Sequence, residues 1–152
     1  MRTYNYYSTK TYGHEEGLSC AFRQPLAKHS HCSLLHGYAL SFSFKFGCDN
    51  LDEKNWVVDF GGLKELKQWL KDNFDHKITV CKDDEQIGRI LKLQEEGLAE
   101  VVVMNGVGCE KFAEHVYSHV APKVLSESEQ RVRLVSVEVF EHGANSAICI
   151  GD

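Results

Sequence analysis

Residues 39–47, ALSFSFKFG, show the clearest hydrophobic pattern in the chain. One side of this stretch carries Leu40, Phe42, Phe44 and Phe46, and the other carries Ser41, Ser43 and Lys45. Because successive side chains of a strand point to opposite faces, this alternation predicts an antiparallel strand with one buried face. Residues 18–24 predict a weaker first strand, and residues 131–142 and 145–151 predict a closing hairpin around the turn sequence HGAN.

Three other segments have apolar residues at helical spacing. Residues 63–74 predict the first helix. Its apolar stripe is Leu63, Leu66, Leu70 and Phe74. Residues 83–97 predict a short second helix, and residues 108–125 predict a longer one that is interrupted or bent at Pro122. Residues 98–106 fit a short strand or an extended connection, and the mixture of elements predicts an α+β fold.

Composition and charge limit the classes of function. With 152 residues, 43% of them hydrophobic, the chain is large enough for one domain over 1–152 and too small for two. Its net charge is -5 and its 17 Lys and Arg residues are spread out, which argues against nucleic acid as a partner. No apolar run approaches the roughly 20 residues that cross a bilayer, and the first residues lack the apolar core of a signal peptide. We therefore expect a cytoplasmic protein without a membrane partner.

The stretch KHSHCSLLHGYAL gathers the first candidate reactive side chains, which are His29, His31, Cys32 and His36. None of the six cysteines forms a CxxC pair, so in a reducing compartment we interpret them as core residues with at most one reactive thiol. A thiol close to imidazoles can act as a nucleophile or a proton acceptor, which favours Cys32. The alternative is that Cys32 only packs in the core.

Two carboxylates, Asp75 and Glu141, occupy positions that suggest a catalytic or binding role. Asp75 directly precedes His76 after the first predicted helix, where a carboxylate can orient an imidazole for acid-base work; the alternative is a solvated surface pair. Glu141 has the strand parity of Val137, so a strand that continues to residue 141 turns this carboxylate toward the apolar face, where it needs a partner. If the strand instead frays before that residue, Glu141 is solvated.

The order of five motifs resembles that of one protein family. CSLLHGYAL is followed by WVVDFGGLKELKQWL, FDHKIT, GCEKFAEHVYSHV and VEVFEH. This order, over about residues 18–150, is similar to that of the 6-pyruvoyl-tetrahydropterin synthase and 6-carboxytetrahydropterin synthase family. The resemblance implies a tunnelling fold (T-fold), an α+β subunit with an antiparallel four-stranded sheet and two main helices packed on one face. It also implies a homo-oligomer, a trimer or a hexamer, with sites between subunits.

The resemblance also implies roles for individual residues. Cys32 matches the catalytic cysteine of the family, and Asp75 and His76 match the pair that completes its proton-transfer triad. Glu141 matches the glutamate that anchors the pterin through its guanidine-like N–H edge. Glu110 matches an acidic residue near the start of the second family helix, although an acid there also suits a helix N-terminus without any ligand.

Members of this family bind zinc through three histidines, and the sequence departs from that set. Only His36 is kept, because Tyr38 and Phe22 stand at the other two positions. Phenylalanine cannot bind a metal, and a neutral tyrosine is a poor ligand. Either Zn2+ is absent, or His29 and His31 join His36 in a rebuilt metal site.

The resemblance leaves more than one function open. The first is a lyase like 6-carboxy-5,6,7,8-tetrahydropterin synthase, which would act on 7,8-dihydroneopterin triphosphate or a related pterin on the route to 7-deazaguanine compounds such as queuosine. The second is a zinc-less protein of the same fold that binds a pterin or purine-like ligand without turnover. A purely structural oligomer subunit is the third, and it predicts that Cys32 and His76 lie far apart or are buried by packing.

Overall fold

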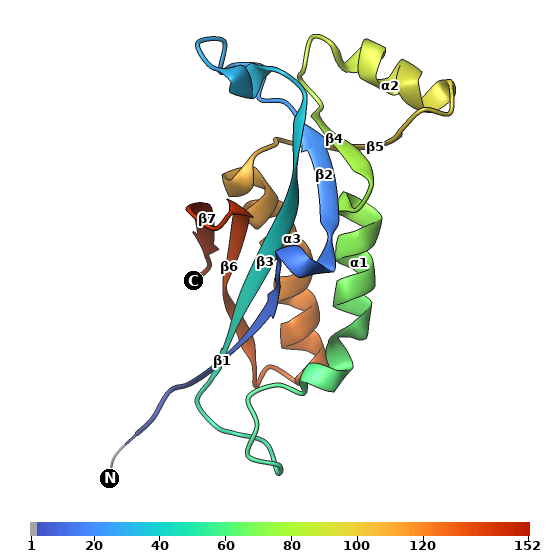
Figure 1. Cartoon of the computed structure of the whole chain (residues 1–152). Helices are drawn as coiled ribbons and strands as arrows, with labels where there is room; N and C mark the ends of the chain where they lie inside the picture. The colour runs from blue at the N-terminus through green and yellow to red at the C-terminus, as the bar shows by residue number, and fades with distance from the viewer. Residues whose placement is uncertain (1–2) are drawn as a thin grey trace.

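A computed structural model describes residues 3–152, so residues 1–2 of the predicted domain 1–152 lie outside the described part. The described chain folds into a mixed sheet and three α-helices, which confirms the α+β prediction (Figure 1). The strands are β1 (Tyr6–Tyr12), β2 (Leu18–Phe22), β3 (His36–Cys48), β4 (Lys77–Cys81), β5 (Glu100–Met104), β6 (Arg133–His142) and β7 (Asn145–Ile150). The helices are α1 (Lys64–Phe74), α2 (Ile87–Glu95) and α3 (Cys109–Glu127).

The sheet of the described chain has seven strands, so the prediction of a four-stranded antiparallel sheet was wrong. Its order is β5-β4-β2-β3-β6-β7, and β1 pairs with β3 outside this path. The pairs β2–β4 and β4–β5 are parallel, and the other pairs are antiparallel. The larger sheet is possible because β3 has 13 residues: its first part pairs with β2 and its second part with β1.

Two of these strands, β1 and β4, were not predicted. β1 alternates between exposed and half-buried residues, but its sequence YYSTKTY has polar or tyrosine side chains on both faces. β4 has five residues and is buried at two consecutive positions, Thr79 and Val80, so it lacks a period of two. A short strand without alternation cannot be distinguished from a loop by its hydrophobic pattern.

The core lies between the sheet and the helices α1 and α3, which pack on the same face (Figure 1). The four apolar residues of the 39–47 alternation are fully buried, as predicted. Phe74 of α1 contacts Phe42 of β3, with ring centroids 4.9 Å apart, and Phe112 of α3 at 5.2 Å. Phe22, the last residue of β2, packs edge-on against Phe112 at 5.1 Å. These aromatic contacts anchor the end of β2, where the candidate site begins.

The longest helix, α3, is continuous, so the alternative of an interruption at Pro122 was wrong. Pro122 lacks the N–H that would bond the carbonyl of Ser118, four residues earlier. Both residues are exposed, so water can satisfy that carbonyl and the helix continues. Neither α3 nor any other helix in residues 3–152 has the length and apolar character needed to span a membrane.

Candidate functional site

A cavity of about 510 Å³ opens where the loop after β2, the start of β3, the start of α3 and the β6–β7 hairpin meet. We call it the site cavity. Its titratable lining residues are Cys32, His36, Cys109, Glu110 and Glu141. All of these except Cys109 were candidate site residues in the sequence. Cavities of roughly 300–1,000 Å³ with converging polar groups are typical of small-molecule sites, so this is the candidate functional site.

Cys32 reaches the site cavity from the loop between β2 and β3, and backbone hydrogen bonds hold this loop in place. The Cys32 N–H donates to Ser30 Oγ at 3.2 Å, and the Cys32 carbonyl accepts from the Gln24 N–H at 2.7 Å. The Arg23 Nε–H donates to the Ser33 carbonyl at 2.8 Å. The thiol of Cys32 is half-buried and free, so it is both positioned and accessible to a ligand.

Glu141 lies in a β-bulge near the end of β6. The pairing with β7 shifts between Phe140 and His142, which leaves Glu141 as the extra residue. The strand therefore continues past residue 141, and Glu141 is half-buried against the site cavity. Strand parity alone placed this carboxylate toward the core, whereas the bulge turns it to the cavity wall.

The N-terminus of α3 supplies Cys109 and Glu110. Gly108 precedes them with φ +104, a backbone conformation that favours glycine. Burial raises the pKa of the Cys109 thiol to about 11, and the negative charges of Glu141 and Glu110 contribute to the rise. Cys109 is therefore a neutral thiol near pH 7. Glu110 is exposed, a position compatible both with ligand contact and with a stabilising acid in the first helical turn.

Phe22, His36 and Tyr38, the residues that the resemblance assigns to the zinc-ligand positions, come together on β2 and β3. Phe22 is directly paired with His36 across the two strands. The ring centroids are 5.3 Å apart for Phe22 and His36, 5.4 Å for His36 and Tyr38, and 6.1 Å for Phe22 and Tyr38. We call these residues the aromatic triad. Burial raises the pKa of Tyr38 to about 12, and a hydrogen bond between its side chain and that of Glu141 adds to the rise.

The aromatic triad does not fit a zinc ion. His36 Nδ1 lies 2.6 Å from the Leu34 carbonyl, which leaves Nε2 as its free nitrogen, and Phe22 has no donor atom. His29 and His31 are exposed and do not line the site cavity. Among residues 3–152, no three His, Cys, Asp or Glu side chains are grouped so that they could hold a metal ion. The structure therefore does not assemble the proposed site of His29, His31 and His36.

Asp75 and His76 pair with each other, but away from the site cavity. An Asp75 carboxylate oxygen lies 2.8 Å from His76 Nδ1 and accepts from the Ser19 N–H at 3.3 Å. Ser19 lies in the first part of β2, whereas the carbonyl of Cys32 accepts a hydrogen bond from the Gln24 N–H, beyond the other end of that strand. His76 is exposed and directly follows α1, which Figure 1 shows beside β2, away from the β6–β7 hairpin. Within one chain this pair does not reach Cys32.

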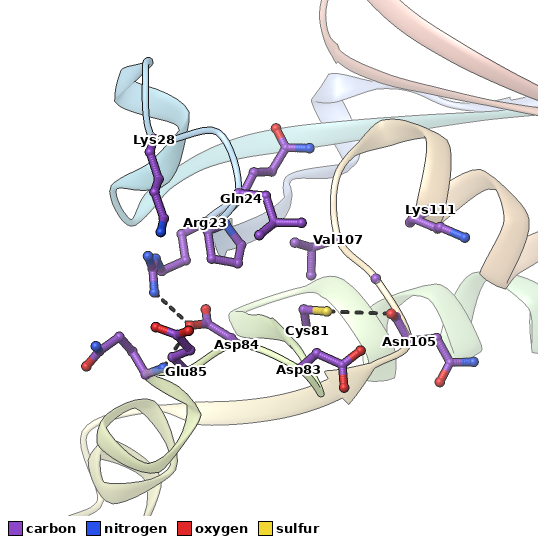
Figure 2. Close-up of a pocket in the computed structure, with 14 residues that line it drawn as sticks. Arg23, Gln24, Lys28, Cys81, Asp83, Asp84, Glu85, Asn105, Val107 and Lys111 are labelled. Atoms are coloured by element: carbon purple, nitrogen blue, oxygen red, sulfur yellow. Dashed lines mark hydrogen bonds and ion pairs between the residues drawn. The ribbon is translucent and has the colours of Figure 1, made fainter.

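A second cavity, of about 450 Å³, lies on the other side of Gln24, which lines both cavities. In Figure 2, Arg23 and Lys28 reach it from the loop after β2, and Asp83 and Asp84 from the loop after β4. Arg23 Nη1 lies 2.7 Å from Asp84 Oδ1, and the Asp84 side chain is 1% exposed. We call it the paired cavity. The hydrophobic pattern does not predict this ion pair, because the pair joins two loops that are far apart in the sequence.

Comparison with known proteins gives the family of the chain. The family model described as 6-pyruvoyl tetrahydropterin synthase matches residues 12–152. The chain belongs to the 6-pyruvoyl tetrahydropterin synthase family. Members of this family typically use zinc, whereas residues 3–152 of this chain form no group of side chains that could hold a metal ion.

Relatives and solved structures agree with this family. Proteins named 6-carboxy-5,6,7,8-tetrahydropterin synthase from Rickettsia bellii and Rickettsia conorii are 30% and 27% identical over 111 residues, or 72% of this chain and 78% of each relative. An uncharacterised protein of Wolinella succinogenes has a TM-score of 0.77 at 16% identity, with 100% of both chains covered. The 6-pyruvoyl tetrahydropterin synthase of Plasmodium vivax has a TM-score of 0.66 at 15% identity, with 95% of this chain and 97% of that one covered. The structural matches show a shared fold.

Proposed function

We propose that the chain binds a pterin in the site cavity and acts on it as a lyase like 6-carboxy-5,6,7,8-tetrahydropterin synthase. One observation carries this proposal: Cys32, Glu110 and Glu141 come from three separate segments and line the same cavity. The family supports a pterin as the ligand. The proposed substrate is 7,8-dihydroneopterin triphosphate or a related 6-substituted pterin, on a route to 7-deazaguanine compounds such as queuosine.

The proposed roles follow from the chemistry of each side chain. The Glu141 carboxylate would accept the two parallel N–H groups at the guanidine-like edge of the pterin, a charge-assisted arrangement that fixes the ring. The Cys32 thiol would then exchange a proton with the substrate side chain as a general acid or base. Glu110, at the start of α3, would contact the same ligand. We assign no step to zinc, because the side chains at its usual position do not fit it.

Asp75 and His76 would complete the proton-transfer triad from a second copy of the chain, so the proposal includes a homo-oligomer. The edge strand β7 supports this, because its Ile148 and Ile150 are 54% and 71% exposed. Exposed apolar residues on a sheet edge favour pairing with another subunit. Size-exclusion chromatography with light scattering should give a trimer or a hexamer, and a monomer with full activity would contradict this part.

The test of the reaction compares two cysteines in neighbouring cavities. Purified wild type, Cys32→Ala and Cys81→Ala are incubated with 7,8-dihydroneopterin triphosphate, and the products are identified by mass spectrometry. Cys32→Ala should lose at least about 100-fold in turnover, the usual contribution of a positioned acid or base. Cys81 lines the paired cavity, so its variant should keep wild-type turnover. Equal turnover in all three proteins would contradict the role of Cys32.

A second candidate function is pterin binding without turnover. Two observations favour it: the aromatic triad replaces the metal ligands, and Asp75 and His76 lie away from Cys32 in one chain. Calorimetric titration with a 6-substituted pterin separates the two functions. Binding with no product from wild type would support the second candidate, whereas absence of both binding and turnover would contradict both.

A further inference from the structure

The aromatic triad lies where the resemblance places the three zinc ligands of the family, but only one of its members is a histidine. Phe22 and His36 face each other across β2 and β3, and Tyr38 is the next residue on the same face of β3. Their rings are within 5.3 to 6.1 Å of one another. The backbone therefore still brings together three side chains that could have been ligands, but imidazole remains at one position only.

Tyr38 connects the triad to the proposed pterin anchor. Its ring lies 6.2 Å from that of His142, the residue after Glu141 in β6, and the Glu141 carboxylate contributes to the raised pKa of the Tyr38 phenol, so the two side chains are neighbours. Tyr38 is half-buried and does not line the site cavity, so it is not expected to contact the ligand itself. A carboxylate in a bulge has few backbone constraints of its own, and a neutral O–H donor fixes its direction.

We infer that this chain holds its ligand without zinc, and that Tyr38, at a former metal-ligand position, acts as a positioning residue for Glu141. The inference about Tyr38 rests on the proposed function of Glu141, whereas the inference about zinc does not. A neutral phenol is a poor zinc ligand, and Phe22 fills the remaining ligand position with a ring that belongs to the core. Packed aromatic rings thus lie where the resemblance places the zinc ligands.

The metal test uses zinc itself and needs no pterin. Wild type, His36→Ala and Phe22→His/Tyr38→His are equilibrated with zinc chloride, desalted and analysed for bound metal by mass spectrometry. Wild type should retain less than about 0.1 zinc per chain, whereas the double variant should retain about one, because three imidazoles with an open fourth position make a zinc site. One zinc in wild type that is lost in His36→Ala would overturn the inference.

The double variant changes a buried residue, so its folding is checked by circular dichroism and thermal unfolding. A folded double variant that binds no zinc would contradict the assignment of the aromatic triad to former ligand positions, and would overturn that part of the inference. If the double variant does not fold, the comparison of wild type with His36→Ala still decides whether zinc binds at this position.

The positioning test separates Tyr38 from a general structural role. Tyr38→Phe keeps the ring but removes the donor, and should weaken affinity for a 6-substituted pterin about tenfold, the effect of losing a hydrogen bond to a charged group. In a Glu141→Gln background the same change should have almost no effect, because the carboxylate it supports is gone. Tyr117→Phe is the matched control: its phenol donates to the Leu134 carbonyl at 3.0 Å, outside the site cavity, so its loss should leave affinity unchanged.

The outcomes of the positioning test are distinct from a failure of the proposed function. If wild type binds no pterin, the proposed function fails while the zinc result remains valid. Suppose instead that wild type binds pterin through Glu141. The positioning role of Tyr38 is then wrong if Tyr38→Phe binds as tightly as wild type. It is also wrong if Tyr38→Phe weakens binding by the same factor with Glu141 present and in the Glu141→Gln background.

Discussion

Gln24 lines both the site cavity and the paired cavity, but the two cavities differ in the ion pairs that their carboxylates form. In the paired cavity, the buried Asp84 carboxylate is bonded to Arg23 and to the backbone N–H of Gln86, so its charge holds two loops together. In the site cavity, Glu110 and Glu141 have no ion pair among the described residues. One oxygen of the buried Asp84 carboxylate thus holds two loops together in the first cavity, although its Oδ2 has no hydrogen-bond partner. In the second cavity neither carboxylate is used in an ion pair within the described chain.

This difference indicates which cavity is the functional one better than size does, because the two have similar volumes. A buried ion pair within one chain contributes mainly to the arrangement of that chain. A half-buried carboxylate that faces neutral donors and a thiol is ready to bind an N–H group from outside. The paired cavity supports the other one, since Arg23 also bonds the carbonyl of Ser33, next to Cys32.

The largest effect should come from breaking the ion pair of the paired cavity. Arg23→Met leaves the Asp84 carboxylate buried without its partner, which should reduce the free energy of unfolding by about 3 kcal/mol. Glu110→Gln, in the site cavity, should change the free energy of unfolding by less than about 0.5 kcal/mol, because only the charge of an exposed side chain is removed. Urea unfolding followed by circular dichroism measures both. Similar losses in the two variants would show that the cavities do not differ in this way.

The sequence pattern predicted part of the sheet and part of the lining of the site cavity, for physical reasons. Alternation along residues 39–47 and helical spacing around Phe112 predicted core faces correctly, since burial on one face imposes a period. β4 was missed because buried positions in succession have no period, and its parallel partners lie far away in sequence. The bulge at Glu141 depends on the pairing of two strands, which one strand's pattern does not contain. The ion pair of Arg23 and Asp84 is likewise a contact between distant loops.

The second largest effect should be on ligand affinity. Glu141→Gln replaces the proposed anchor by an amide that cannot accept two N–H groups with a full charge, and should weaken pterin affinity about 100-fold, or about 2.7 kcal/mol. Glu85→Gln changes an exposed acid of the paired cavity in the same way and should leave affinity unchanged. Calorimetric titration with a 6-substituted pterin measures both. If Glu85→Gln weakened binding as much as Glu141→Gln, the paired cavity would also belong to the site.

Gly108 lines the site cavity and Gly106 lines the paired cavity, so alanine substitutions there compare the two cavities by their effect on stability alone. Gly108 has φ +104, and a Cβ there would lie 2.4 Å from Gln24 Nε2, so Gly108→Ala should reduce the free energy of unfolding by about 2 kcal/mol. Gly106 lines the paired cavity without a left-handed φ, and a Cβ there would lie 2.7 Å from Lys111 Cγ, so the Lys111 side chain would have to shift. Gly106→Ala should therefore cost about 1 kcal/mol, less than Gly108→Ala, in the same urea experiment. Added to Gly108→Ala, the change Gln24→Ala should remove the close contact at residue 108 but not the backbone strain. The double variant should therefore regain only part of the lost free energy of unfolding.

The smallest effect should be a dependence of stability on alkaline pH that comes from Cys109 in the site cavity. Its pKa is raised from 9.0 to about 11, first by burial and then by the charges of Glu141 and Glu110. Between these values the unfolded chain releases the thiol proton and the folded chain keeps it, so the free energy of unfolding falls as pH rises. Cys109→Ser removes this contribution, and wild type should therefore lose about 1 kcal/mol more than the variant between pH 9 and pH 10. Parallel urea curves at both pH values measure this difference, and an equal loss in the two proteins would mean that the thiol is not shielded from water in the folded state.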